Sequence, residues 1–228
     1  MLRRRENRKR LRLILGLGVA GVLFAGGMAL AAGQTIVGTA ANTYDAPTYT
    51  TNQGVVVPFQ VTGSTHNVTA NANGPDGRAL FRSPTISGGT AGVNGTQYLT
   101  AGTYSFICTI HPSTMQATLV VSANGTPQTR PHADLKLRSK KISKVTKKGL
   151  LVEVDTNTKI DGASLAASLG KTSLGKASDV SLAAGQQFVV IKLTKAGKNK
   201  LRGRNKATVV MSADIPFGSP ASGKGKLT

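Results

Sequence analysis

One cysteine, one histidine and one methionine lie close together near the middle of the chain. In the stretch YSFICTIHPSTM, Cys108 is the single cysteine of the 228 residues, His111 follows three positions later, and Met115 follows four positions after that. A second histidine, His66, lies upstream. Thiolate and thioether sulfur stabilise Cu(I), and imidazole nitrogen suits Cu(II). These side chains therefore predict a mononuclear copper site with methionine as its weak axial ligand.

Two expected strands explain how one loop can carry three of these ligands. GTYSFIC and MQATLVVSA alternate in the manner of strands, and the loop between them turns back. Cys108 would then end the first strand, His111 would lie at the bend beside Pro112, and Met115 would begin the second strand. His66 would arrive from a neighbouring strand and complete the site.

The segment that contains these ligands, residues 33–123, has the pattern of an all-β domain. Apolar side chains alternate along VVVPFQV, and Tyr104, Phe106 and Cys108 share the expected core face of a later strand. NGPDGRALFRSP and SGGTAGVNGTQ are rich in glycine, asparagine and proline, which indicates turns and long loops. No stretch of helical period competes. The economical interpretation is a β-sandwich of about seven or eight short strands.

Two motifs of this segment resemble one family. YSFICTIHPSTM followed by QATLVV is similar to the closing loop of the plastocyanin, amicyanin and pseudoazurin group of cupredoxins, and VVVPFQVTGSTHNVTA is similar to their upstream segment. The resemblance implies a Greek-key sandwich with one type 1 copper ion. It also implies that His66, Cys108 and His111 are equatorial ligands and Met115 the axial one. Asn67 resembles the asparagine that joins the two ligand-bearing segments by hydrogen bonds.

The same loop argues against an enzyme. Cys108 is flanked by Ile107 and Thr109, so the His-Cys-His signature that couples a type 1 site to a trinuclear cluster is absent. Three histidines are too few for a multicopper oxidase, and one cysteine cannot bridge a dinuclear centre. We therefore expect an electron carrier that works by Cu(I)/Cu(II) cycling. The alternative is a non-redox copper-binding or cell-surface attachment protein in which the basic C-terminal part of the chain makes the main contact.

The charge of the chain falls into three regimes. The formal net charge is +20, of which residues 1–32 carry +6, residues 33–128 carry none and residues 129–228 carry +14. The chain is therefore not uniformly basic, and the expected copper domain is neutral.

The N-terminal 32 residues have the pattern of a targeting segment. MLRRRENRKRLR is strongly basic, an apolar stretch follows, and Ala29-Leu30-Ala31 supplies the small residues of a cleavage site. The apolar stretch also approaches the length of a membrane span, so residues 1–32 are expected to be a signal peptide or a membrane anchor. Either predicts an exported protein that is extracellular, on the cell surface or periplasmic. In that oxidising setting a lone cysteine is best explained as an occupied ligand.

The basic C-terminal half is expected to form a second β domain. NGTPQTRPHAD, residues 124–134, is the expected linker, with His132 a solvated residue in it. Apolar runs between 135 and 217 predict strands, DGASLAASLG and LTKAGKNKLRGR predict short helical turns, and 218–228 is expected to be a flexible tail. The pattern weakly resembles small immunoglobulin-like modules of actinobacterial surface proteins.

The positive charge of this half leaves several partners open. It contains no catalytic constellation. Phe188 and Phe217 are its only aromatic residues, so it lacks side chains for stacking on bases, and the export signal is also unfavourable to a nucleic-acid partner. The remaining interpretations are a solvated basic surface, attachment to anionic cell-wall polymers or lipid headgroups, and docking of an acidic redox partner.

Overall fold

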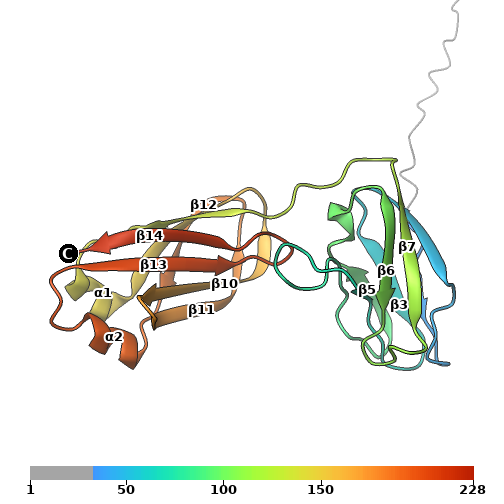
Figure 1. The fold of residues 1–228 in the computed structure, drawn as a ribbon, viewed down its shortest axis with the longest axis horizontal. Coiled ribbons are helices and arrows are strands. Elements are labelled where there is room, and N and C mark those ends of the chain that lie inside the picture. The colour runs from blue at the N-terminus through green and yellow to red at the C-terminus, as the bar shows by residue number, and fades with distance from the viewer. Residues whose placement is uncertain (1–32) are drawn as a thin grey trace, which may run out of the picture.

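The computed structural model describes residues 33–228, and the expected signal peptide or anchor over residues 1–32 lies outside them. The described residues form two β domains joined by a connecting segment, residues 123–132 (Figure 1). Among these residues no helix is both long and apolar enough to cross a membrane.

The N-terminal domain is a sandwich of two sheets. One sheet has the strand order β1-β3-β5, and the other has the order β2-β7-β6-β4. Strand β1 runs parallel to β3, and β2 runs parallel to β7, whereas the remaining pairs are antiparallel. The all-β prediction is confirmed. The elements are β1 (Ile36–Gly38), β2 (Thr48–Asn52), β3 (Val57–Val61), β4 (Thr69–Ala70), β5 (Gly89–Val93), the 3₁₀ helix η1 (Thr96–Tyr98), β6 (Gly102–Ile107) and β7 (Gln116–Ser122).

Alternating burial on the strands builds the core of this domain. Val57, Phe59 and Val61 of β3 point inward, in agreement with the period of two in the sequence. At the centre lies Phe106 of β6, which is fully buried and meets the ring of Tyr44 at a centroid distance of 5.1 Å. Because Cys108 lies two residues beyond Phe106, the same alternation turns its thiol into the core.

Two local expectations for this domain are wrong. SGGTAGVNGTQ, expected to be a loop, contains β5, which pairs in register with β3 from Val57↔Val93 to Val61↔Gly89. Pairing with a strongly apolar strand overrides the weak strand propensity of its glycines. Conversely, His66 was expected on a neighbouring strand, but it lies before the two-residue strand β4, in an isolated bridge to Ile86.

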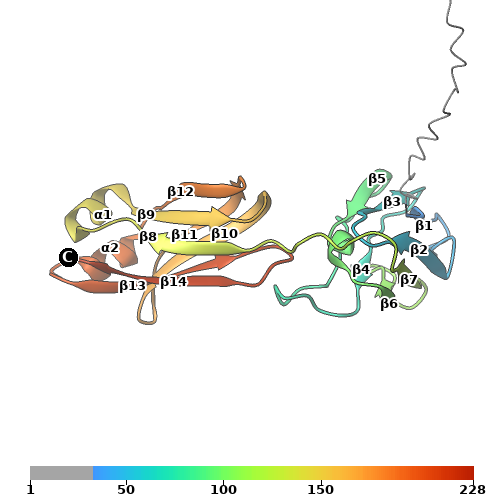
Figure 2. The ribbon, with the colours of Figure 1, turned by 90° about the horizontal axis from the view of Figure 1, so that it is seen from above.

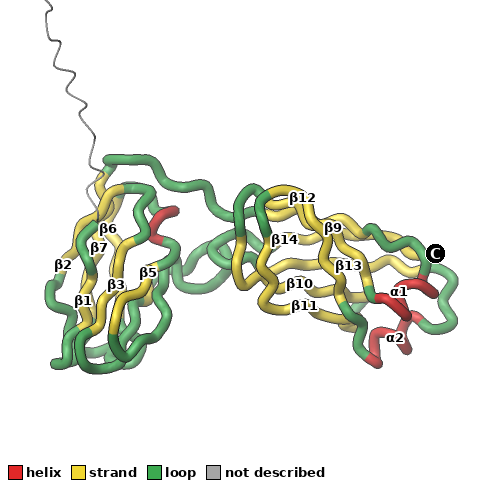
Figure 3. The backbone as a smooth tube through the Cα atoms, turned by 180° about the vertical axis from the view of Figure 1, so that it is seen from behind, coloured by secondary structure: helices red, strands yellow, loops and turns green. Residues whose placement is uncertain are grey.

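The C-terminal domain also has two sheets, with strand orders β11-β10-β13-β14 and β12-β9-β8. All of its strand pairs are antiparallel. Its two short helices lie at the end farthest from the first domain (Figure 3). The relation to immunoglobulin-like modules stays a prediction. The elements are β8 (Ala133–Leu137), α1 (Ile142–Lys148), β9 (Leu150–Thr156), β10 (Ile160–Leu169), β11 (Thr172–Leu182), β12 (Gly185–Ile191), α2 (Lys195–Leu201), β13 (Ala207–Asp214) and β14 (Ala221–Leu227).

The sequence misled about three parts of this domain. DGASLAASLG is not helical but lies in β10, because pairing with β11 and β13 on both sides overrides the helix propensity of its alanines. Helix α1 was not expected, whereas the turn expected in LTKAGKNKLRGR is present as α2. The expected flexible tail, residues 218–228, contains strand β14, so the domain extends past the expected boundary at residue 217.

Two glycines explain why β14 did not look like a strand. A Cβ at Gly223 would lie 2.5 Å from the carbonyl oxygen of Leu135, and one at Gly225 would lie 2.4 Å from the Cβ of Leu137. Glycine therefore allows β14 to approach β8 closely at the edge of the sandwich. Leu227 then closes the core as a fully buried side chain.

The turn between β13 and β14 makes the contact between the two domains. The N–H of Phe217 donates to Asp76 Oδ2 at 3.0 Å, and the Arg82 guanidinium lies 4.0 Å above the Phe217 ring and 3.0 Å from the same carboxylate oxygen. Arg78 forms an ion pair with Asp214, and Arg130 of the connecting segment donates to the Phe217 carbonyl. We call this set of residues the domain latch. Figure 2 shows that the connecting segment also runs between the two domains, as a loop without helix or strand.

Acid is expected to release the domain latch. Burial opposes the charged form of Asp76, but hydrogen bonds from the Phe217 N–H and from Arg82 outweigh it and hold the pKa of Asp76 below its ordinary value. The latch is therefore stabilised above the ordinary carboxyl pKa and weakens as the pH falls through the depressed value. Small-angle X-ray scattering should then show a larger radius of gyration.

The Asp76→Ala variant tests the same contact at neutral pH. It removes the acceptor of the partly buried Phe217 N–H, which costs about 1 kcal/mol, so the variant should already be expanded and show no further step in acid. A variant whose scattering matched the parent protein at neutral pH would contradict this role of Asp76.

Candidate metal centre

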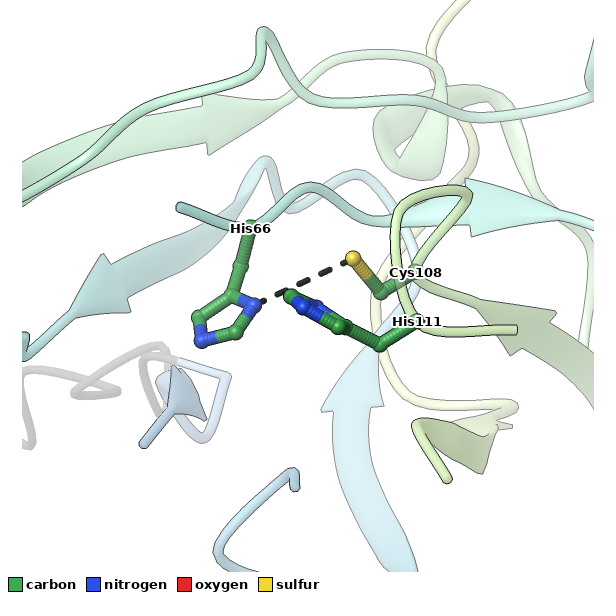
Figure 4. Close-up of side chains that lie close together, drawn as sticks. All are labelled: His66, Cys108 and His111. Carbon is green, nitrogen blue, oxygen red and sulfur yellow. Dashed lines mark hydrogen bonds between the residues drawn. The ribbon is translucent and has the colours of Figure 1, made fainter. Parts of the chain in front are cut away.

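Three of the predicted ligands come together at one end of the first domain. Single ligand atoms of His66, Cys108 and His111 all lie within 4.8 Å of one another (Figure 4). Cys108 directly follows β6, His111 lies in the loop before β7, and His66 comes from the segment between β3 and β4. His66 and Cys108 are fully buried, and His111 is half-buried. Sheet pairing thus gathers residues that are 42 positions apart in the sequence.

The ring of His66 is held in one tautomer by the backbone. Its Nε2 lies 2.9 Å from the carbonyl oxygen of Thr39. A carbonyl can only accept, so Nε2 carries the proton, and Nδ1 of the neutral ring presents a lone pair. That Nδ1 lies 4.0 Å from Cys108 Sγ, as the dashed line in Figure 4 shows. A metal-ligating histidine usually has its second nitrogen bound in this way.

The Nδ1 atom of His111 has no hydrogen-bond partner although it is buried. In the described part of the chain it is one of two such buried side-chain polar atoms, the other being Asn42 Oδ1. The His111 ring meets the His66 ring edge-on, with centroids 5.1 Å apart. A buried polar atom without a partner costs about 1–3 kcal/mol, which a bound metal ion would recover.

Met115 lies at the closing end of the same loop. Its side chain is fully buried, its N–H donates to the His111 carbonyl at 2.9 Å, and its carbonyl accepts from the Cys108 N–H at 3.0 Å. The loop thus folds back on itself, and its two ends are held together next to the three gathered ligands.

Asn67 joins the two segments that carry the ligands. Its Oδ1 accepts from the Thr109 N–H at 2.9 Å, and its Nδ2 donates to Thr109 Oγ1 at 2.7 Å and to Thr85 Oγ1 at 3.0 Å. Asn67, which follows His66, is thus hydrogen-bonded to Thr109, which follows Cys108. These bonds fix the spacing of the two ligands.

Tyr44 supports this connection from the core. Its hydroxyl donates to the Asn67 carbonyl at 2.8 Å. Burial raises the pKa of Tyr44, and the nearby Cys108 raises it further, so the hydroxyl keeps its proton and remains a donor.

Sequence reasoning missed the contribution of Gly38 and Thr39. Thr39 accepts the His66 hydrogen bond through its backbone carbonyl oxygen. Every residue type has this atom, so the identity of residue 39 could not have predicted the contact. Gly38 lies against the His66 ring, and a Cβ there would be 2.9 Å from His66 Cδ2. A glycine followed by no recognisable motif gives no hint of this contact.

The Gly38→Ala variant should weaken metal binding. Its methyl group would displace the His66 ring from the Thr39 carbonyl, and disturbing such a support typically costs 10–100-fold in metal affinity, so we expect about that loss. Competition with a chelator of known Cu(I) affinity measures it. The matched control is Gly88→Ala, because nothing lies within 4 Å of a Cβ at that position. Equal affinities for the two variants would contradict the role of Gly38.

The geometry of the site fits one copper ion. Bonds to thiolate sulfur of about 2.3 Å and to imidazole nitrogen of about 2.0 Å add to roughly 4.3 Å, so an ion fits between Sγ and Nδ1 atoms that are 4.0 Å apart. One thiolate and two imidazoles in a trigonal set, with a thioether on the same loop, are the donors of a blue-copper site.

The strand arrangement and this donor set place residues 33–123 among the cupredoxins. No protein-family model and no curated protein sequence matches the chain. Among solved structures it is similar to amicyanin. A reduced tryptophan-to-tyrosine variant of amicyanin is 30% identical over 39% of this chain and 82% of that chain, with a TM-score of 0.31.

Other amicyanin variants give the same picture. An oxidised proline-to-glycine variant is 28% identical over 43% of this chain and 89% of that chain, and a Cu(I) methionine-to-alanine variant is 29% identical over 39% and 82%, both with a TM-score of 0.31. In these matches the similarity covers 39–43% of this chain.

Proposed function

We propose that the protein is an exported type 1 copper protein that carries single electrons by cycling between Cu(I) and Cu(II). The observation that supports this most is the gathering of two imidazoles around one buried thiol: Nδ1 of His66 lies 4.0 Å from Cys108 Sγ, and the buried Nδ1 of His111 has no hydrogen-bond partner. His66, Cys108 and His111 would hold the ion, and Met115 would be its weak axial ligand. Such a mixture of soft and nitrogen donors suits both oxidation states of copper.

The position of His111 supports electron transfer through its ring. It is the one gathered ligand that is only half-buried, whereas His66 and Cys108 are sealed in the core. Its sequence neighbours Ile110 and Pro112 are exposed, so apolar side chains flank His111 on both sides along the loop. A partner that covers this loop would come close to the metal without opening the site.

Export is proposed from the N-terminal segment and from the cysteine. The basic and apolar residues 1–32 have the composition of a signal peptide or anchor. The chain has no second cysteine with which Cys108 could form a disulfide, and the thiol is fully buried, so an oxidising compartment is compatible with the site.

Titration with Cu(II) followed by redox cycling tests the proposal. One equivalent should produce the intense visible absorption of a thiolate–copper bond, and reductant and oxidant should remove and restore it over many cycles. Failure to develop colour would refute the copper site. A site that developed colour but did not cycle would indicate copper storage or sensing, which is the alternative function, instead of electron transfer.

A further inference from the structure

The charge of the C-terminal domain is segregated along its strands. Segments 138–149 and 192–206 carry thirteen of the twenty basic residues of residues 129–228 and none of the six acids. They contain α1 and α2, which lie at the end farthest from the first domain (Figure 1). Acidic residues gather toward the opposite end. There Asp134 of β8 lies opposite Asp155 of β9 in the sheet, and Asp214 forms an ion pair with Arg78 of the first domain. One end of the domain is therefore cationic.

A hollow of about 440 Å³ opens at this cationic end beside α1. Its floor is apolar, formed by Val145, Leu151 and Val190, and its rim is basic. We call it the cationic groove. The basic residues of its rim are Arg138, Lys140, Lys141, Lys144 and Lys148. Arg138 is paired with Glu153, but the structure gives the four lysines no ion pair within the described residues.

An apolar ridge continues from the groove onto the outer face of the β9–β12 pair. Five large apolar side chains are exposed among the described residues, and three of them lie here: Leu151 at 37%, Phe188 at 60% and Val190 at 47%. Leu151 pairs with Val190, and Phe188 lies two residues before Val190, so all three point to the same side. The three side chains are therefore exposed to solvent on one face of the strand pair.

We propose that the groove and the ridge dock the protein on a membrane surface that contains anionic lipids. Lysines around the rim match the phosphate of such lipids, and each basic residue near an anionic bilayer contributes about a fivefold increase in binding. Exposed aromatic and aliphatic side chains beside the lysines can enter the boundary between headgroups and acyl chains. A hydrophilic polyanion would use the lysines but would gain nothing from Phe188 and Val190, which is why the membrane is favoured over an anionic polymer.

Vesicle sedimentation tests this surface. The probes are phosphatidylcholine vesicles with and without phosphatidylglycerol, mixed with the full chain and with residues 33–228, which contain both described cores. The shorter chain removes any contribution of the apolar residues 1–32. It should bind the mixed vesicles and not the neutral ones, and added salt should weaken the binding. Absence of binding to the mixed vesicles would overturn the proposal.

Matched variants separate the groove from net charge. In the shorter chain, Lys144→Ser with Lys148→Ser should weaken binding roughly 25-fold, and Phe188→Ser about tenfold. The charge-matched control is Lys159→Ser with Lys176→Ser, two exposed lysines outside the groove, which should change binding less than about twofold. All three variants should keep the copper absorption and the unfolding midpoint of the parent chain, because every changed side chain is exposed.

Two outcomes would overturn the assignment. Equal losses in the lysine variant and its control would show a general charge effect and not a groove. A loss in the lysine variant without one in Phe188→Ser would indicate an anionic polymer as the ligand of this surface instead of a membrane.

Discussion

Replacing Cys108 with serine is expected to abolish the visible absorption of the copper-loaded protein and to lower its Cu(I) affinity more than about 100-fold, a greater loss than a supporting residue usually causes. The thiolate is the only sulfur ligand of the gathered set, and a serine hydroxyl stays protonated and gives no comparable charge-transfer band. Absorption spectra and chelator competition measure both effects. The buried site can accept serine, because its side chain is slightly smaller than that of cysteine.

Ser113→Ala is the control for this result. Ser113 is exposed on the same loop between His111 and Met115 and does not belong to the gathered ligand set. Its variant should keep the colour and the affinity. A Cys108→Ser protein that remained blue would refute the assignment of the thiolate, whatever the behaviour of the histidines.

Replacing Phe106 with alanine is expected to lower the free energy of unfolding of the copper domain by about 4 kcal/mol. The side chain is fully buried, and its ring lies 5.1 Å from that of Tyr44, 6.1 Å from that of Tyr49 and 6.1 Å from that of Phe81. Its removal would leave a cavity that three rings and two sheets cannot fill without moving. Urea denaturation of the metal-free protein measures the loss.

Phe188→Ala makes the same chemical change at an exposed position and is the matched control. That side chain is 60% exposed, so its removal should change the stability by less than about 0.5 kcal/mol. Similar losses for the two variants would contradict the central place of Phe106 in the core.

The ligands could be predicted from the sequence because their chemistry is carried by rare side chains. Cys108, His111 and Met115 belong to residue types that occur one, three and four times in the chain, so their spacing on one loop is informative. The loop's position was also predictable, since alternating apolar residues mark the strands before and after it. The structure brings His66 to the same place, as the upstream motif suggested.

The parts that could not be predicted depend on backbone atoms and on glycine. The Thr39 carbonyl fixes the His66 ring, yet no residue type announces a carbonyl. Glycine-rich segments were interpreted as loops, although β5 and β14 are strands whose glycines are tolerated or needed for close packing. The alanines of β10 likewise suggested a helix. Helix propensity reflects only the local sequence, whereas pairing with β11 and β13 decides the structure here.

The strands of the two domains run in different directions, so the molecule is bent (Figure 1). The loop with Cys108 and His111 lies at the start of β7, whereas the connecting segment leaves from its end, about 23 Å away for a strand of seven residues. The cationic groove lies at the far end of the second domain, so neither surface obstructs the other. Such a protein could bind two objects at once. If the groove holds it on a layer that also carries its redox partners, the search for them becomes two-dimensional, and a weak contact around His111 would suffice because its effective concentration is high.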